Sequence, residues 1–220
     1  MNTIKIIVTE DGSHSLLNEA LDETYHSKHG AIRESQYVFI NHGFHHWLTI
    51  NKSKSISILE VGFGTGLNAL LTIQEATKNN ITVDYTSLET FPLAAEVWEK
   101  LNYPDSGNLF KDLHQAGWQT WCQINNCFSL LKLEKSLLTI ELSPAQFDLI
   151  YFDAFAPNKQ PEMWEMAVLE KVIRCLKSGG MFVTYCAKGQ LKRDLKSLGV
   201  MVETLPGPPG KREMVRAVKS

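Results

Sequence analysis

Two short segments of the chain combine residue types that could do chemistry. In EVGFGTGLN (residues 60–68), three glycines alternate with Phe63 and Thr65. Glycine lets a backbone turn sharply and come close to a ligand. In DLIYFDAFAP (residues 148–157), Asp153 and Phe155 follow an apolar run. The first segment predicts a loop around a cofactor, and the second predicts an acidic group beside a flat substrate.

The glycine segment alone is also typical of dinucleotide enzymes or of a plain strand–helix turn. Two acidic residues favour S-adenosylmethionine. Glu60 precedes Gly62 by two positions, where it could bond a cationic amino group and would repel a pyrophosphate. Glu89 ends the next apolar segment, where a carboxylate could accept both ribose hydroxyls. The third-glycine position of a GxGxxG motif is Leu67, which weakens the dinucleotide alternative.

Asp153 is the candidate catalytic residue. The methyl group of a sulfonium is already activated, so the protein has only to hold a nucleophile in line with it. An amine nucleophile must be neutral when it attacks, and a carboxylate can accept its N–H and take the proton. Asp153 fits that role, and Phe155 could present an aromatic ring to the substrate. The alternative is that Asp153 only caps a turn.

The elements expected around these segments alternate between strand and helix. We expect strands at 55–62, 81–90, 128–134, 137–142, 147–155, 181–187 and 200–207, and helices at 67–79, 91–103, 163–180 and 188–199. This rhythm predicts an α/β fold with a mainly parallel sheet and helices on both faces. Together with the glycine segment and its acidic residues, we expect a Rossmann-like class I methyltransferase. We expect one domain over residues 1–220. Its N-terminal segment, 1–50, would be an extension capping the sheet, with a strand at 4–8, a helix at 15–25 and short strands at 37–40 and 47–50.

Composition limits the possible partners. The 220 residues carry a formal net charge of −2, so a nucleic acid would have to bind a local basic patch. The sequence has no apolar run long enough to span a membrane and no secretion signal, so we expect a cytoplasmic protein without a membrane partner. Five of the seven histidines lie between His26 and His46. Their irregular spacing and the lack of neighbouring cysteines favour a polar segment over the crevice, including Tyr25 and Ser27, rather than a metal site.

Several longer segments resemble one known family. DAFAPNKQPEMW (153–164) and PGPPGKREMVRA (206–217) closely resemble the methyltransferase domain of the tRNA 5-methylaminomethyl-2-thiouridine biosynthesis proteins. Segments 25–43, 59–71, 87–93 and 185–195 agree as well, so the resemblance spans about residues 20–218. It implies transfer of a methyl group to the 5-aminomethyl group of the wobble uridine, with the tRNA anticodon loop as partner. Many members carry a second, flavin-dependent domain, and this chain is expected to be a stand-alone methyltransferase form.

The resemblance also completes the expected site. One departure is Ser136, which stands where many such enzymes have an acidic residue near the adenine. The cofactor-binding residues are expected to be Glu60, Gly62, Phe63, Gly64, Thr65, Gly66, Asn68, Glu89, Thr90, Ser136 and Asp153. Phe155, Lys211 and Arg212 are expected to bind the substrate. Lys188, Lys192 and Lys196 share helical spacing and could, with Arg33, add to a basic surface, or they could simply solubilise a helix.

Two alternatives remain open on the same fold. A small-molecule amine methyltransferase would suit the net charge of −2. A nonenzymatic module that only binds S-adenosylmethionine would have no use for Asp153.

Overall fold

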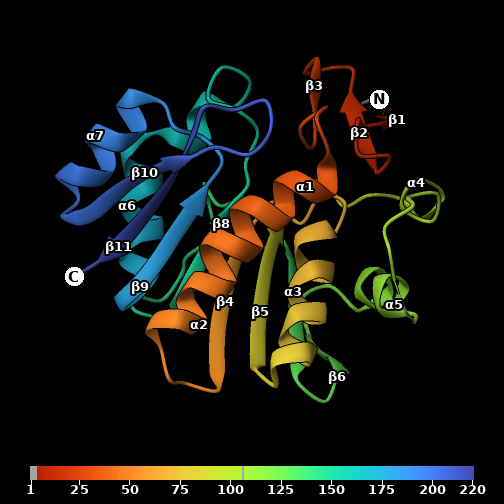
Figure 1. Ribbon diagram of the computed structural model, residues 1–220, viewed down its shortest axis with the longest axis horizontal. Helices are drawn as coiled ribbons and strands as arrows, with labels where there is room; N and C mark the ends of the chain where they lie inside the picture. Colours follow the sequence, from red (N-terminus) through yellow and green to blue (C-terminus); the bar gives the residue numbers. More distant parts are fainter. Residues whose placement is uncertain (1–3, 106) are drawn as a thin grey trace.

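The computed structural model describes residues 4–105 and 107–220 and is built around an eight-stranded sheet (Figure 1). The strand order is β10-β11-β9-β8-β4-β5-β7-β6. Five neighbouring strands run parallel: β9 (Leu176–Thr184), β8 (Phe147–Phe152), β4 (Ser55–Val61), β5 (Thr82–Glu89) and β7 (Phe128–Glu134). The edges are antiparallel, formed by β6 (Trp121–Asn125) on one side and by β11 (Glu213–Lys219) and β10 (Val200–Pro206) on the other. The mainly parallel α/β sheet predicted from the sequence is confirmed.

Register explains why the two motifs meet. Val61 of β4 is paired with Phe152 of β8 and with Leu88 of β5. The residues that follow these three, Gly62, Asp153 and Glu89, therefore leave the sheet side by side at its carboxyl edge. The ends of β4 and β8 are buried under helices on both faces of the sheet, so a slip by one residue would place a side chain of different shape in each packed position.

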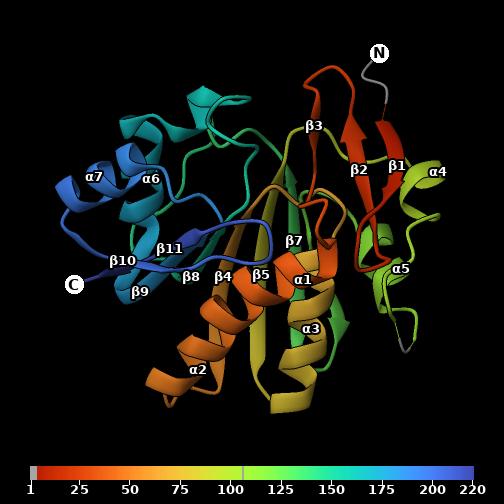
Figure 2. The same cartoon turned by 45° about the horizontal axis from the view of Figure 1, so that its top comes forward.

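Helices cover both faces of the sheet, as predicted (Figure 2). One face carries α3 (Leu67–Asn79), α5 (Leu109–Gln115) and a continuous helical stretch of α1 (Ala31–Ser35), a π-helical segment η1 (Gln36–His45) and α2 (His46–Ile50). The other face carries α6 (Met166–Cys175) and α7 (Gly189–Ser197). The short α4 (Ala95–Trp98) and the 3-10 turn η2 (Pro161–Trp164) lie in the connections. No helix in the described ranges is long and apolar enough to cross a membrane.

The structure corrects the prediction for the N-terminal segment. The helix expected at 15–25 is wrong: β2 (His14–Asn18) and β3 (Glu23–Thr24) form an antiparallel hairpin with β1 (Ile4–Val8). The Asn18 side chain accepts hydrogen bonds from the backbone N–H groups of Ala20 and Leu21, and so stabilises the turn.

The strands expected at 37–40 and 47–50 are wrong as well, because both segments belong to the helical stretch from α1 to α2. Val38, Phe39, Ile40 and Trp47 are buried against the sheet, and this burial overrides the strand preference of the two segments. Gly43, expected in a turn, lies inside η1. A Cβ atom there would sit 3.2 Å from the side chains of Tyr151 and Val183, so glycine allows this close contact with the sheet.

Other elements also differ from the prediction. Residues 137–142 form no strand, and the Lys171 ammonium binds three of their carbonyls at 2.9–3.1 Å. The helix expected at 163–180 ends at Cys175, because residues 176–180 pair into β9. The helix expected at 91–103 is reduced to α4. The strand at 200–207 is followed by β11, which the sequence analysis missed.

Candidate functional site

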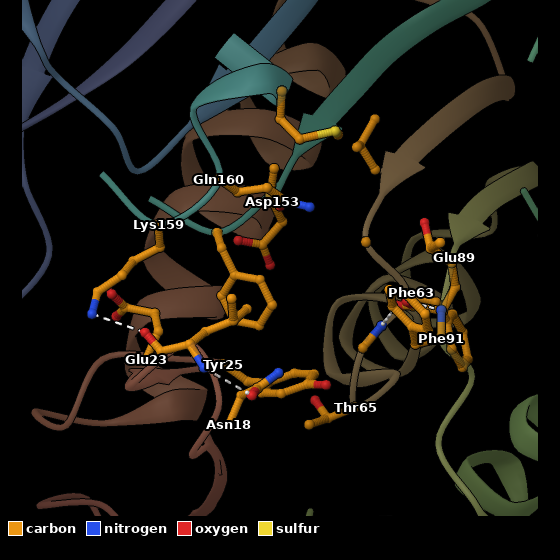
Figure 3. A pocket seen from close by; sticks show the side chains of 18 of the residues that line it. Asn18, Glu23, Tyr25, Phe63, Thr65, Glu89, Phe91, Asp153, Lys159 and Gln160 are labelled. Carbon is orange, nitrogen blue, oxygen red and sulfur yellow. Dashed lines mark hydrogen bonds between the residues drawn. The ribbon is translucent and has the colours of Figure 1, made fainter. Parts of the chain in front are cut away.

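A cavity of about 1060 Å³ opens at the carboxyl edge of the central strands. Most of its lining comes from the glycine loop, the residues after β5, those after β7, the loop after β8, and the β2–β3 hairpin with the residues that follow it, and Glu34, Tyr185 and Lys211 also line it. This edge is where open parallel sheets bind their ligands. Figure 3 shows Asp153 on one side of the cavity and Glu89, Phe63 and Phe91 on the other.

Glycine is required in the loop after β4. Gly62, Gly64 and Gly66 have φ values of 94°, 49° and 73°, in the region that other residues rarely adopt. A Cβ atom on Gly62 would lie 2.9 Å from the backbone oxygen of Asp153. Gly62 and Gly64 line the cavity, whereas Gly66 begins α3 and packs against Phe63 and His114.

Glu89 fixes the glycine loop from the neighbouring strand. One carboxylate oxygen accepts the Gly64 N–H at 2.9 Å, and the other accepts the Phe91 N–H at 2.8 Å. Burial nevertheless raises the pKa of Glu89. The carboxylate lines the cavity beside Thr90, at the strand end where ribose hydroxyls are commonly bound.

Glu60 lies beneath the loop and does not line the cavity. Its side chain is fully buried, and Ser87 Oγ donates to its Oε2 at 2.6 Å. Among the described residues, Glu60 Oε1 and Asn68 Oδ1 are both buried without a hydrogen-bond partner. Burial raises the pKa of Glu60 to about 8. A proton on Glu60 would turn one of its oxygens into a donor, so that this buried group need not remain an unpaired acceptor.

We expect Glu60→Gln to be more stable than the parent protein at alkaline pH. The Glu60 pKa lies near 8 in the folded protein and at 4.5 when the side chain is fully solvated, as in the unfolded chain, so the folded state binds more protons between these values. Stability of the parent therefore falls as pH rises through this window, and the neutral amide removes the loss. The gain is on the order of a few kcal/mol above pH 8, since one pKa unit corresponds to about 1.4 kcal/mol. Urea unfolding from pH 5 to 9 measures it, and a constant difference across this range would contradict it.

Asp153 is held where it can exchange a proton. Asn68 Nδ2 donates to its Oδ2 at 2.9 Å. Burial, followed by the charge of Glu34, raises the Asp153 pKa to about 7. Tyr185 and Trp164 donate to the carbonyls of Ala154 and Phe155, which fixes the loop around the carboxylate. A group with a pKa near the working pH is suited to general acid–base catalysis.

The N-terminal hairpin supplies part of the cavity wall, and its residues Asn18 and Glu23 were not indicated by the sequence. Tyr25 meets the edge of the Phe155 ring with a centroid distance of 5.2 Å. Lys159 Nζ donates to the carbonyls of Leu21 and Asp22 at 2.9 and 2.8 Å, and so ties the hairpin to the loop after β8 (Figure 3). Asn18 and Glu23 also line the cavity, as do Tyr25 and Ser27, the two residues singled out from the sequence. Only tertiary packing brings this hairpin to the site.

The remaining expected residues separate into two groups. Phe63, Thr65, Asn68, Ser136, Phe155 and Lys211 all line the cavity. Arg212 does not. It lies at a second, shallower hollow of about 500 Å³, which shares Ala156, Tyr185 and Lys211 with the main cavity and is also lined by Pro157 and Lys188. We call this second feature the basic hollow.

The histidines of residues 26–46 do not gather into a metal site. His26 is buried between Ser15 and Thr65, and burial lowers its pKa to about 4. His45 bonds Glu75, and His29 bonds Glu10. Within residues 4–105 and 107–220, no three histidine, cysteine or acidic side chains are grouped closely enough to hold a metal ion.

The cavity fits S-adenosylmethionine. The backbone of Gly62 and Gly64 forms a cradle that side chains at these positions would disturb. Glu89 offers carboxylate oxygens to ribose hydroxyls, and Phe63, Thr90 and Ser136 line the same cavity. We expect Asn68 and Asp153 to face the end that carries the reactive group.

The chain is similar to several known proteins. A family described as S-adenosyl-L-methionine-dependent methyltransferase matches residues 113–220. The tRNA 5-methylaminomethyl-2-thiouridine biosynthesis bifunctional protein MnmC of Leptospira interrogans is 32% identical over 217 residues, covering 90% of this chain and 33% of that protein. The protein of the same name from Methylobacillus flagellatus is 30% identical, covering 88% of this chain and 32% of its own length. The chain thus spans about a third of the length of these curated relatives.

A solved structure extends the likeness over nearly the whole chain. The crystal structure of MNMC2 from Aquifex aeolicus superposes with a TM-score of 0.83 at 26% identity, covering 99% of this chain and 71% of that one. Its agreement in fold includes the N-terminal half that the 113–220 match leaves out. The chain therefore belongs to the family of S-adenosyl-L-methionine-dependent methyltransferases that includes the methyltransferase part of the MnmC proteins.

Proposed function

We propose that this chain is an N-methyltransferase that converts 5-aminomethyluridine, with or without 2-thiolation, to 5-methylaminomethyluridine at the wobble position of tRNA. The observation that carries this proposal is the placement of Asp153. Its backbone adjoins the glycine loop, and its carboxylate accepts a hydrogen bond from Asn68 just after that loop, in a cavity large enough for the cofactor and a nucleobase, with a pKa of about 7. The names of the matched relatives supply the substrate.

In this proposal the protein positions the acceptor and removes a proton. S-adenosylmethionine, when bound, supplies a methyl group activated by its sulfonium. Asp153 accepts an N–H of the acceptor amine, orients the nitrogen lone pair and takes the proton as the N–C bond forms. Asn68 holds the carboxylate in place through the 2.9 Å hydrogen bond. Tyr25 and Phe155 form an apolar wall that keeps water from the reacting atoms.

A wobble uridine must leave the anticodon stack to enter such a cavity. Unstacked bases in RNA are commonly held against aromatic side chains, and Phe155 offers an aromatic ring at the cavity wall. The backbone on either side of the base needs cations, which the basic hollow provides through Lys188 and Arg212. Such a substrate also implies that the protein works in the cytoplasm.

The test is methyl transfer from labelled S-adenosylmethionine to bulk tRNA from cells lacking the protein, followed by nucleoside analysis. Conversion of 5-aminomethyluridine to 5-methylaminomethyluridine by the parent, and not by Asp153→Ala, is the expected result. Methylation of free amines without methylation of tRNA would support a small-molecule enzyme. Cofactor binding without transfer to either would indicate a binding module.

Arg212→Gln should weaken tRNA binding without affecting the cofactor. If Arg212 neutralises one phosphate, the slope of log affinity against log salt concentration should decrease by about 1. Filter binding over a series of salt concentrations measures this slope. Arg174→Gln is the matched control, because this exposed arginine lies on α6, away from the basic hollow. Equal slopes for the two variants would argue against phosphate contact at Arg212.

A further inference from the structure

Three segments that are distant in the sequence meet on one wall of the cavity. Lys211, in the loop between β10 and β11, bonds Glu34 of α1 and lies 3.6 Å from the ring centroid of Tyr185, which follows β9. The other oxygen of Glu34 accepts the Ser27 N–H at 2.7 Å. Glu34 is only 6% exposed. The lysine expected to bind the substrate is therefore already engaged by a carboxylate.

The ion pair stands beside the proposed base. Glu34, Lys211 and Tyr185 line the same cavity as Asp153. The Tyr185 hydroxyl donates to the carbonyl of Ala154, the residue next to Asp153, at 2.9 Å. The Glu34 side chain is 7% exposed and that of Lys211 is 31% exposed, so the carboxylate loses most of its hydration and the pair is a poor device for stability alone. The ion pair lines the cavity together with Asp153, where the acceptor amine is proposed to bind, and this position suggests a role in the reaction.

We propose that Glu34 and Lys211 are positioning residues that set the electrostatic environment of Asp153 and thereby determine the pH at which it accepts the acceptor's proton. This inference rests on the proposed function for the identity of the acceptor. The effect on the protonation of Asp153 can be measured without knowing the acceptor.

The charges around Asp153 support this assignment. The charge of Glu34 raises the Asp153 pKa, and the charge of Lys211 lowers it. Four nearby titratable groups are neutral near pH 7: burial raises the pKa of Glu60 to about 8, raises those of Tyr85 and Tyr185, and lowers that of His26 to about 4. Glu23, Glu89 and Lys159 also line the cavity, but Glu34 and Lys211 are the side chains whose charges shift the Asp153 pKa.

Because the two charges act on Asp153 in opposite directions, the two single variants should move the acidic limb of the kcat–pH profile in opposite directions. Lys211→Met leaves the Glu34 anion uncompensated, which disfavours ionisation of Asp153 and moves the acidic limb of the kcat–pH profile to higher pH. Glu34→Gln leaves the Lys211 cation, which favours ionisation and moves the limb to lower pH. We expect each displacement to be about one pH unit, a common effect of a nearby charge. A purely structural role would lower kcat at every pH without moving the limb.

The experiment combines kinetics with direct titration. The kcat–pH profile for tRNA methylation is measured for the parent, Glu34→Gln, Lys211→Met and the double variant, whose limb should return toward that of the parent. Glu34→Asp should restore the parent profile, and cofactor affinity by calorimetry should stay unchanged. Lys177→Met is the control, because it breaks a comparable 2.8 Å ion pair with Asp148 that does not line the cavity.

The Asp153 carboxyl is also titrated by carbon-13 NMR in the protein without cofactor or tRNA. Opposite movements of its pKa in the two single variants support the proposal even if tRNA proves not to be the substrate. Movements in the same direction, or none, overturn it. If Lys211→Met fails to fold, Glu34→Gln decides alone, because an unchanged or raised Asp153 pKa in that variant would also overturn it.

Discussion

Asp153→Asn is expected to lower kcat by about 10²- to 10⁴-fold, the usual contribution of a positioned general base. Asparagine keeps the shape of the side chain, and its amide oxygen can still accept the hydrogen bond that Asn68 donates at 2.9 Å. The variant therefore loses the ability to take a proton while the cavity keeps its form. Cofactor affinity should change little. Single-turnover methylation of tRNA, with cofactor binding measured in parallel, separates the two effects.

Glu165→Gln is the matched control for this substitution. Glu165 is an exposed carboxylate at the start of α6 and does not line the cavity, so its removal should leave kcat unchanged. A kcat within tenfold of the parent for Asp153→Asn would mean that the proton leaves by another route. The pH profile adds a second check. The parent should lose activity below about pH 7 as Asp153 becomes protonated, and the variant should lose this dependence.

Gly62→Ala is expected to raise the dissociation constant for S-adenosylmethionine by about 10- to 100-fold. The added Cβ would lie 2.9 Å from the Asp153 carbonyl oxygen, which is backbone and cannot rotate away. A φ of 94° is also strained for any residue other than glycine. The loop must therefore move, and a displaced loop loses contacts that would hold the cofactor. Isothermal titration calorimetry gives the affinity directly.

Gly179→Ala separates backbone strain from the steric clash. Gly179 has a similar positive φ of 74°, but a Cβ there would meet nothing within 4 Å, and the residue lies in β9 away from the cavity. Both variants should lose about 1–3 kcal/mol of stability from the strained backbone. Only Gly62→Ala should lose cofactor affinity. Equal affinities would show that the glycine loop tolerates a side chain.

Electrostatics divide the buried acids of the site into two kinds. Glu60, beneath the loop, is protonated at neutral pH and acts as a hydrogen-bonding group within the protein core. Asp153, at the cavity, has a pKa of about 7, so small changes in neighbouring charge alter its protonation. The Glu34–Lys211 pair is placed to make such a change. The two carboxyl groups differ in pKa because they differ in how deeply they are buried, and the spacing of residues in the sequence does not reveal burial.

Local patterns in the sequence were sufficient for the central elements. The apolar runs before Gly62 and Asp153 predicted β4 and β8, and the helix at 67–79 has the bounds that the sequence suggested. These segments are well specified because their burial repeats with the period of the element that they form. Parallel strands then bring their carboxyl ends to one edge, so the neighbourhood of Gly62, Glu89 and Asp153 could be predicted without coordinates.

The segment before β4 shows where local pattern fails. Its apolar residues are compatible with strand or helix, and packing on the sheet made the second half helical. The hairpin over the cavity depends on contacts across long stretches of chain, such as Lys159 with the carbonyl of Leu21. Strand β11 is likewise fixed by its partners β9 and β10.

By itself, the sequence determined the central parallel strands, the glycine loop, the proposed base and the kind of cofactor, because these follow from residue type and short spacing. Tertiary structure alone decided that Glu60 is buried beneath the loop, that Lys211 is paired with Glu34, and that Arg212 lies at a separate hollow. Burial and charge pairing depend on which distant segments come together. They are therefore properties of the folded chain as a whole and are not encoded in any one motif.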